Sequence, residues 1–232
     1  MANPLVFVTL SPIAMPSLQT LFAFFGVAVL LALSPGPDNV FVLLQSAQRG
    51  WRVGMCVVLG LCLGLIGHTA AVALGLAAVF AASTLAFTVL KLLGAAYLAW
   101  LAWGALRAPV SQVDPDSQQA AAQPLAGQRR SGALRMVGRG VIMNLTNPKV
   151  LIFFLAFLPQ FADPALGPLA PQIMLLGLVF MLATFLVFGA IACFSGVFGA
   201  ILQRSARAQK LLNRTAGLVF LGLALRLAMA ER

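Results

Sequence analysis

The residues LSPGPDN, at positions 33–39, interrupt a hydrophobic segment that runs from about residue 17 to 48. The two prolines each remove a backbone hydrogen-bond donor, and the glycine between them frees the chain. We therefore expect a helix that breaks here and restarts near Asp38. A carboxylate at the centre of a membrane helix costs about 2.5–3.5 kcal/mol and needs a partner, water or a proton. The motif predicts a broken helix that carries a functional carboxylate.

The composition of the 232-residue chain indicates lipid, not water, as its main solvent. Hydrophobic residues make up 61% and charged residues only 9%, whereas a soluble domain is about one-quarter charged. Because these apolar runs are too long and uniform for barrel strands, we expect an all-α integral membrane protein with six transmembrane helices. The six apolar segments lie at about 17–48, 54–80, 84–106, 140–162, 171–202 and 211–229.

Most of the lysine and arginine residues fall in three tracts between apolar segments, whereas the loops near 81–84 and 163–170 carry none. Cytoplasmic loops carry such an excess. We therefore expect a multi-pass inner-membrane protein with both termini periplasmic. The same distribution argues against nucleic-acid binding, despite the net charge of +10. The tracts hold Arg49 and Arg52, then Arg107, Arg129, Arg130, Arg135 and Arg139, and finally Arg204, Arg207, Lys210 and Arg214.

The chain divides into two halves around a stretch rich in Gln, Ala, Ser and Pro. We expect a periplasmic leader (1–16), a first three-helix repeat (17–107), a cytoplasmic linker (108–138) and a second three-helix repeat (139–232). Because each half has an odd number of crossings, related halves must be inverted. Matched patterns in the same order support the relation, namely LSPGPDN with LTNPK, and KLLGAAYL with RTAGLVFL. Inverted repeats with interrupted helices are typical of secondary transporters, whose site lies at the repeat interface.

The pattern NLTNPK, which ends at Lys149, is the counterpart of the first motif in the fourth segment. Asn144 and Asn147 offer amide groups, and Asn147 can cap a helix that starts at Pro148. That helix start and the Lys149 ammonium would attract a carboxylate, while Asp38 could face an ammonium, as a zwitterionic amino acid requires. The alternatives are a lysine that only snorkels to the interface and a direct Asp38–Lys149 ion pair.

Four other polar residues complete the candidate site. Ser34 and Asn39 flank the first break, and Thr146 lies in the second motif. His68 is the only histidine and lies in mid-segment among small residues. It could relay protons, because imidazole titrates near neutral pH. A neutral histidine that is hydrogen-bonded in a helix interface is the alternative.

Taken together, PGPD, NxxNPK, the basic linker between matching halves and GAAYLAWLAWGALR resemble the LysE/RhtB family of amino-acid exporters. The similarity covers nearly the whole chain. It implies efflux of amino acids or related metabolites from a bacterial cytoplasm, driven by the proton motive force. It also implies functional weight on Pro35, Gly36, Pro37, Asp38, Asn144, Asn147, Pro148 and Lys149.

Two other functions share the six-helix layout. A membrane redox protein would carry a cysteine near each break, but Cys56, Cys62 and Cys193 lie elsewhere. A metal-ion exporter would need several converging carboxylates or thiolates, and Asp38 is the only carboxylate clearly inside the apolar segments. No nucleophile–base set indicates an enzyme, and we expect no cofactor and no metal. The expected partners are a small-molecule substrate, protons and the lipid bilayer, with a homodimer as an open alternative.

The charge pattern leads to a test of topology. Reporter fusions after residues 120 and 165 should report opposite sides of the membrane, because the first lies within a basic tract and the second lies in a loop without lysine or arginine. Both fusions reporting the same side would contradict the six-crossing arrangement.

Overall fold

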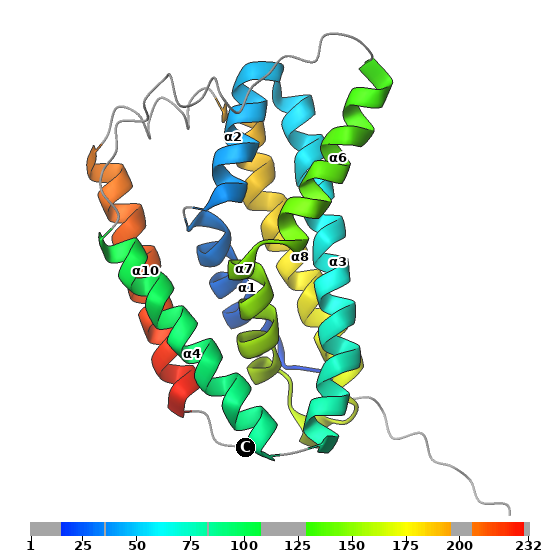
Figure 1. The fold of residues 1–232 in the computed structure, drawn as a ribbon, viewed down its shortest axis with the longest axis vertical. Coiled ribbons are helices and arrows are strands. Elements are labelled where there is room, and N and C mark those ends of the chain that lie inside the picture. The colour runs from blue at the N-terminus through cyan, green and yellow to red at the C-terminus, as the bar shows by residue number, and fades with distance from the viewer. Residues whose placement is uncertain (1–14, 35, 83, 108–128, 196–205, 230–232) are drawn as a thin grey trace, which may run out of the picture.

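The computed structural model describes residues 15–34, 36–82, 84–107, 129–195 and 206–229, and every regular element in these ranges is a helix (Figure 1). The expectation of an all-α protein is therefore confirmed for the described residues. The expected leader lies mostly outside these residues, as do much of the linker and the end of the fifth segment. The α-helices are α1 (Leu18–Leu33), α2 (Pro37–Arg49), α3 (Trp51–Ala82), α4 (Thr84–Arg107), α6 (Arg129–Leu145), α7 (Pro148–Ile152), α8 (Leu169–Cys193) and α10 (Ala206–Met229).

Both expected helix breaks are present. The axes of α1 and α2 differ by 65°, and those of the segments on either side of the second break differ by 52°. At each break a proline occupies the start of the new helix, Pro37 in α2 and Pro148 in α7. This is where proline is tolerated, because the N–H it lacks would have no partner within the helix. Proline chemistry alone thus predicts both interruptions.

The second break is followed by a further departure from α-helix. A π-helical turn, η1 (Phe153–Phe157), continues α7 and leads into the 3₁₀ turn η2 (Leu158–Phe161). A second 3₁₀ turn, η3 (Pro164–Leu166), precedes α8. Inserted π turns are frequent at functional sites.

The fourth segment begins earlier than the sequence predicts. Its helix α6 starts at Arg129, inside the expected linker (108–138), and not near residue 140. The extra turns carry arginine, alanine, leucine and methionine, which are good helix formers. Hydropathy detects only the apolar part of this helix, so it places the boundary too late.

Two helices among the described residues, α3 and α8, are each long and apolar enough to cross a membrane. The number rises to four if each bent pair counts as one span. Many large apolar side chains on the outer faces are exposed, for example Phe22, Leu74 and Leu134. Extended apolar surface of this kind is unfavourable in water, so lipid is the environment that suits it.

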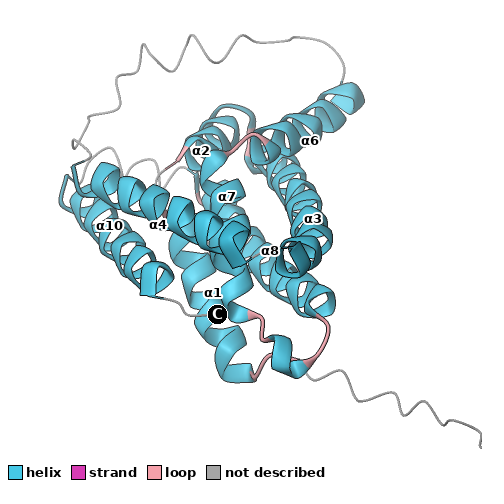
Figure 2. Cartoon of the chain, turned by 60° about the horizontal axis from the view of Figure 1, so that its bottom comes forward, coloured by secondary structure: helices cyan, strands magenta, loops and turns pink. Residues whose placement is uncertain are grey.

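The interrupted segments lie in the centre of the bundle. On one side of α1 and α7 lies the pair α4 and α10, and on the other side lie α3 and α8 (Figures 1 and 2). Helix α1 contacts α8 and α10, while η1 contacts α4 and α3. The breaks are therefore surrounded by protein, as unpaired backbone groups at membrane depth require.

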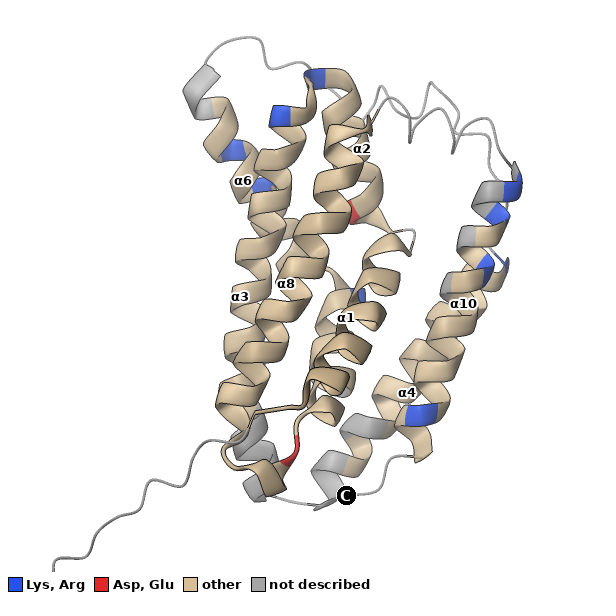
Figure 3. Cartoon of the chain, turned by 180° about the vertical axis from the view of Figure 1, so that it is seen from behind, with Lys and Arg blue, Asp and Glu red and all other residues tan. Residues whose placement is uncertain are grey.

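Positive charge gathers at one end of the bundle. Figure 3 shows most of the described lysine and arginine residues where α2 ends and where α6 and α10 begin. We call this the basic end. The opposite end carries the start of α1, the turns η2 and η3, and the end of α10.

Helices α3 and α6 approach closely through glycine. A Cβ atom added to Gly60 would collide with the carbonyl oxygen of Val137 and would lie 2.9 Å from the Cα of Gly140. A Cβ on Gly64 would lie 2.7 Å from the Oδ1 of Asn144. Small residues that let backbones meet are typical of membrane helix pairs. The glycine spacing thus positions the second break against α3.

The glycine contact leads to a stability test. Gly60→Ala should destabilise the protein by about 1–3 kcal/mol, because rigid backbone must move to admit the methyl group. Gly75→Ala is the matched control on α3, since nothing lies within 4 Å of its added Cβ. Thermal unfolding of the purified protein in detergent measures both. Equal unfolding midpoints for the two variants would contradict the close contact.

Candidate functional site

The Asp38 carboxylate lies in the first turn of α2, is 3% exposed and is held from the other half of the chain. The Nδ2 of Asn147 donates to Asp38 Oδ2 at 2.7 Å. Asn147 Oδ1 accepts from the backbone N–H of Lys149 at 3.0 Å and so caps α7. Because the amide nitrogen must donate and its oxygen must accept, these two bonds fix the orientation of the Asn147 amide. Among the residues that the structure describes, Asp38 Oδ1 has no hydrogen-bond partner.

The Lys149 ammonium reaches across to the other break. It donates to the backbone carbonyls of Leu31 at 3.2 Å and Ser34 at 3.1 Å, both at the end of α1. A helix C-terminus carries partial negative charge and unpaired carbonyls, so an ammonium stabilises it. Lys149 is buried and its hydrogen bonds go to α1 and not to Asp38. It neither snorkels to the interface nor takes part in a hydrogen-bonded pair with Asp38.

Gly36 is the residue that lets the ammonium approach the break. A Cβ on Gly36 would lie 3.1 Å from Lys149 Nζ. Its backbone is extended, with φ −166°, so the reason for glycine here is space and not conformation. Nearby, the Nδ2 of Asn39 donates to the carbonyl of Ala32 at 2.7 Å, while no described residue donates to Asn39 Oδ1.

The second break is stabilised by α3. The carbonyl oxygen of Asn144, at the end of α6, accepts from the backbone N–H of Asn147 at 3.0 Å and lies 3.1 Å from His68 Nε2. Because the partner is a carbonyl, Nε2 must carry the proton. His68 is 5% exposed. This geometry favours the interpretation of His68 as a hydrogen-bonded interface residue. Its role in proton relay stays a prediction.

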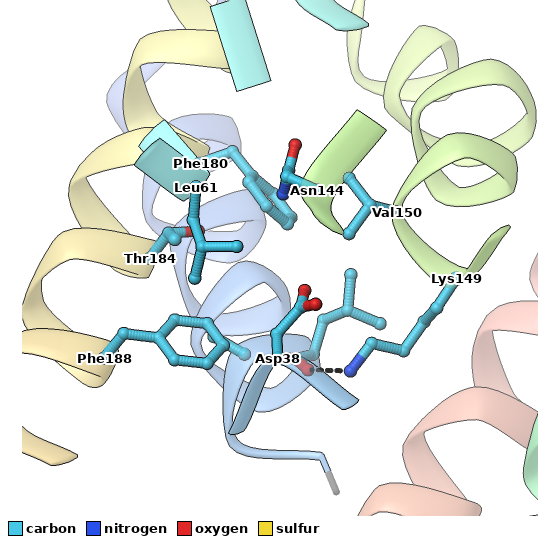
Figure 4. Close-up of a pocket in the computed structure, with 10 residues that line it drawn as sticks. Asp38, Leu61, Asn144, Lys149, Val150, Phe180, Thr184 and Phe188 are labelled. Atoms are coloured by element: carbon cyan, nitrogen blue, oxygen red, sulfur yellow. Dashed lines mark hydrogen bonds between the residues drawn. The ribbon is translucent and has the colours of Figure 1, made fainter. Parts of the chain in front are cut away.

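A small cavity lies where the two breaks meet (Figure 4). Its volume of about 20 Å³ is room for about one water molecule. Asp38, Asn144 and Lys149 line it, and Asn144 Oδ1, like Asp38 Oδ1, has no hydrogen-bond partner in the described ranges. The remaining walls come from α1, α3, α7 and α8, and include Leu61, Phe180, Thr184 and Phe188.

The α8 wall was missed by sequence reasoning. Thr184 lines the cavity and is 3% exposed. The signal was present, since Thr184 is a polar residue inside a long apolar segment. A single threonine is nevertheless common in membrane helices, so its position alone did not distinguish it.

Not every predicted site residue faces the cavity. Thr146 is exposed, and its hydroxyl donates to the carbonyl of Ile142 in the preceding helix, α6, at 2.8 Å. Ser34 contributes its backbone carbonyl to Lys149. Pro37 and Pro148 are exposed and shape the helix starts, and Pro35 lies outside the described residues.

A cluster of phenylalanines closes the cavity toward the end opposite the basic end. Phe180 lines the cavity and packs on Phe153 with ring centroids 5.4 Å apart. The ring centroid of Phe24 lies 6.2 Å from that of Phe153 and 5.0 Å from that of Phe161. Phe24 and Phe153 are fully buried. We call Phe24, Phe153, Phe161 and Phe180 the phenylalanine barrier.

Residues 29–231 match the family model of the LysE type translocators. The match covers most of the chain, so the protein belongs to this family. Translocators of this kind are membrane proteins that move small molecules and are not enzymes, and the family resemblance stated from PGPD and NxxNPK is confirmed.

Two of the relatives with a stated activity are efflux proteins. The chain is 33% identical over 210 residues to a homoserine/homoserine lactone efflux protein of Salmonella typhimurium, covering 90% of this chain and 96% of the relative. It is 30% identical to a leucine efflux protein of Klebsiella pneumoniae, covering 91% and 100%. An uncharacterized membrane protein of Vibrio cholerae is 31% identical, covering 90% and 96%. No solved structure matches the chain.

The bond between Asn147 and Asp38 leads to a stability test. Asn147→Ala removes the α7 cap and leaves the buried carboxylate without its partner, so it should cost about 1–3 kcal/mol. Thr146→Ala is the neighbouring control, because that side chain is exposed and bonds the preceding helix, α6. The midpoints of thermal unfolding of the two variants, measured at the same detergent concentration, are compared with that of the wild type. A shift for Asn147→Ala no larger than for the control would contradict the cross-break contact.

Proposed function

We propose that this protein is a secondary transporter that exports amino acids or closely related metabolites from the bacterial cytoplasm, coupled to the proton motive force. The observation that carries the proposal is the buried Asp38 carboxylate, which has an unpartnered oxygen beside a cavity at the meeting point of two helix breaks. Buried charge inside a membrane segment is costly and usually functional. The names of the two efflux relatives support the same substrate class.

The helix contacts support six crossings in two inverted repeats. Helix α3 packs on α6, the first half of the second interrupted segment. The counterpart of α3 in the other repeat is α8, and it packs on α1, the first half of the first interrupted segment. The pairs α3–α8 and α4–α10 each join a helix to its own counterpart, as a twofold axis requires. Helices α4 and α10 have 24 residues each, and at about 1.5 Å per residue such a helix exceeds the hydrocarbon thickness.

The basic end supports a cytoplasmic orientation for the loops that follow α2, α4 and α8. Positive charge is retained on the cytoplasmic side during membrane insertion. With six crossings this orientation puts both termini in the periplasm. The phenylalanine barrier then lies between the cavity and the periplasm, and the structure corresponds to a transporter closed on that side.

The unpartnered atoms of the site support a substrate with an ammonium group. Within the described parts of the chain, Asp38 Oδ1 and Asn144 Oδ1 in the cavity lining, and Asn39 Oδ1 in the residue after Asp38, are buried acceptors without a partner. A buried acceptor without a donor costs about 1–3 kcal/mol, more if it is charged. An ammonium supplies three N–H donors and a compensating charge, so it suits Asp38 and its amide neighbours.

Lys149 supports recognition of a carboxylate. At least two of its three N–H donors are held by the carbonyls of Leu31 and Ser34. A substrate carboxylate is a better partner for the ammonium than a neutral carbonyl, because charge-assisted hydrogen bonds are stronger. Transfer of Lys149 from α1 to the substrate would release the end of α1. Binding and helix movement would thus be linked.

Protonation of Asp38 supplies the coupling step. With Asp38 ionised, the site holds a substrate ammonium. When a proton entering from the periplasm neutralises Asp38, the ammonium loses its counter-charge and the substrate can leave. A ligand shifts a conformational equilibrium only through its different affinity for the two states, and the two protonation states provide that difference.

Efflux measurements test the proposal. Cells that express the protein should grow better than control cells on a panel of toxic amino acids and analogues. They should also release preloaded radiolabelled L-leucine or L-homoserine faster. No protection and no faster release across the panel would contradict export of amino acids.

The central residues can be tested separately. Asp38→Asn and Lys149→Ala should each reduce efflux to background while the protein still inserts, because each removes one of the two substrate charges. Gln48→Ala is the control in α2, where the side chain is exposed. Near-normal, pH-gradient-dependent efflux from Asp38→Asn at matched membrane abundance would show that Asp38 is not the coupling residue.

A further inference from the structure

A second cavity opens at the end of the bundle opposite the basic end. It has a volume of about 340 Å³, within the range of small-molecule pockets. Gln19 and Thr20 from the first turn of α1, Phe161 from η2 and Arg226 from the last turn of α10 line it. Asp163, which follows η2, completes it. Two opposite charges and several polar groups therefore share one pocket.

Arg226 is unusual for its position. It lies at the end of the bundle that is expected to face the periplasm, where positive charge is depleted in membrane proteins. Its guanidinium lies over the Phe161 ring, 5.1 Å from the centroid. An arginine that merely snorkels to the lipid headgroups would extend away from the protein. The contact with Phe161 instead directs the guanidinium to the pocket.

Asp163 is held in place by the fully buried Gln172. The backbone N–H of Asp163 donates to Gln172 Oε1 at 2.9 Å, and Gln172 Nε2 donates to the Asp163 carbonyl at 2.9 Å. The Asp163 Oδ1 atom accepts from the N–H of Ala165 at 2.8 Å. These bonds order the segment before any ligand binds, and an ordered site loses less entropy on binding.

The phenylalanine barrier separates this pocket from the central cavity. Phe161 lines the outer pocket and Phe180 lines the central cavity. The Phe24 ring lies close to both, with its centroid 5.0 Å from the centroid of Phe161 and 6.3 Å from that of Phe180. The two cavities are therefore distinct compartments with an aromatic partition between them. A solute that crosses the barrier from the central cavity enters the outer pocket next.

We propose that the outer pocket is an exit site for the exported solute, a zwitterion whose carboxylate binds Arg226 and whose ammonium faces Asp163. This inference rests on the proposed export function. Arginine binds a carboxylate through two parallel N–H donors, which gives it both strength and orientation. Solute that accumulates outside would occupy the same pocket and slow further release.

The test is inhibition of efflux by external solute. The pocket must face the medium, so the experiment uses intact cells and not everted vesicles. Cells preloaded with radiolabelled L-leucine or L-homoserine are diluted into buffers that contain increasing concentrations of the same solute without label, and the rate of efflux is measured. Each rate is expressed relative to that variant's own rate in solute-free buffer. In Arg226→Gln, the external concentration for half-inhibition should rise about tenfold, because a charge-assisted hydrogen-bonding partner is lost.

Three comparisons make the result specific. Arg226→Lys keeps the charge and should show a smaller rise, whereas Arg207→Gln, an exposed arginine at the basic end of the same helix, should show none. In the wild type, 3-methylbutylamine, which is leucine without its carboxylate, should inhibit at least about tenfold less well than leucine.

The outcomes separate the exit site from the transporter itself. Efflux by the wild type without inhibition by external solute, or equal half-inhibition for Arg226→Gln and Arg207→Gln, would overturn the exit site and leave the proposed function standing. Absence of any efflux by the wild type would contradict the proposed function. Equal inhibition by leucine and 3-methylbutylamine would show that the pocket does not bind a carboxylate.

Discussion

The hydrogen bond from Asn147 to Asp38 joins two helix breaks that are 109 residues apart in the chain. Around it, each break stabilises the other. The end of α1 is neutralised by Lys149 from the second break, and the start of α2 presents a carboxylate to an amide from the same break. A broken helix exposes backbone groups and is tolerated in a membrane only where protein or water satisfies them. Here the two halves of the chain satisfy each other.

This reciprocity is compatible with the proposed binding and release of a charged solute. The internal contacts of Lys149 are backbone carbonyls, which a carboxylate can replace, and Asp38 keeps one oxygen unpartnered. A site whose groups were all strongly paired would exclude a substrate, while an unpaired buried charge would destabilise the fold. Partial pairing leaves the site between these extremes. The helices around the site are held in place by the phenylalanine barrier and by the glycine contacts between α3 and α6.

Sequence alone predicted the features that depend on local chemistry. The prolines at 37 and 148 fixed where helices restart, and apolar length predicted the helices themselves. It also predicted that Asp38 and Lys149 belong to one site, but it did not predict which groups each of them hydrogen-bonds in the fold. Long-range packing decides that Lys149 bonds α1, that Thr146 points away and that Thr184 lines the cavity. No local pattern encodes these contacts, because they depend on which helix faces of the two halves meet.

The central claim is that the exported solute binds between the two breaks, in a state of the transporter in which the cavity, which here has room for about one water molecule, is enlarged. Substrate protection of a cysteine placed in that cavity tests it most directly. Thr184→Cys is introduced into a variant whose three native cysteines are replaced, and its modification by a small thiol reagent is timed with and without the exported amino acid. Our account predicts that saturating amino acid slows the modification, while an amino acid that is not exported has no effect. Equal modification rates with and without the exported amino acid would contradict a binding site at the helix breaks.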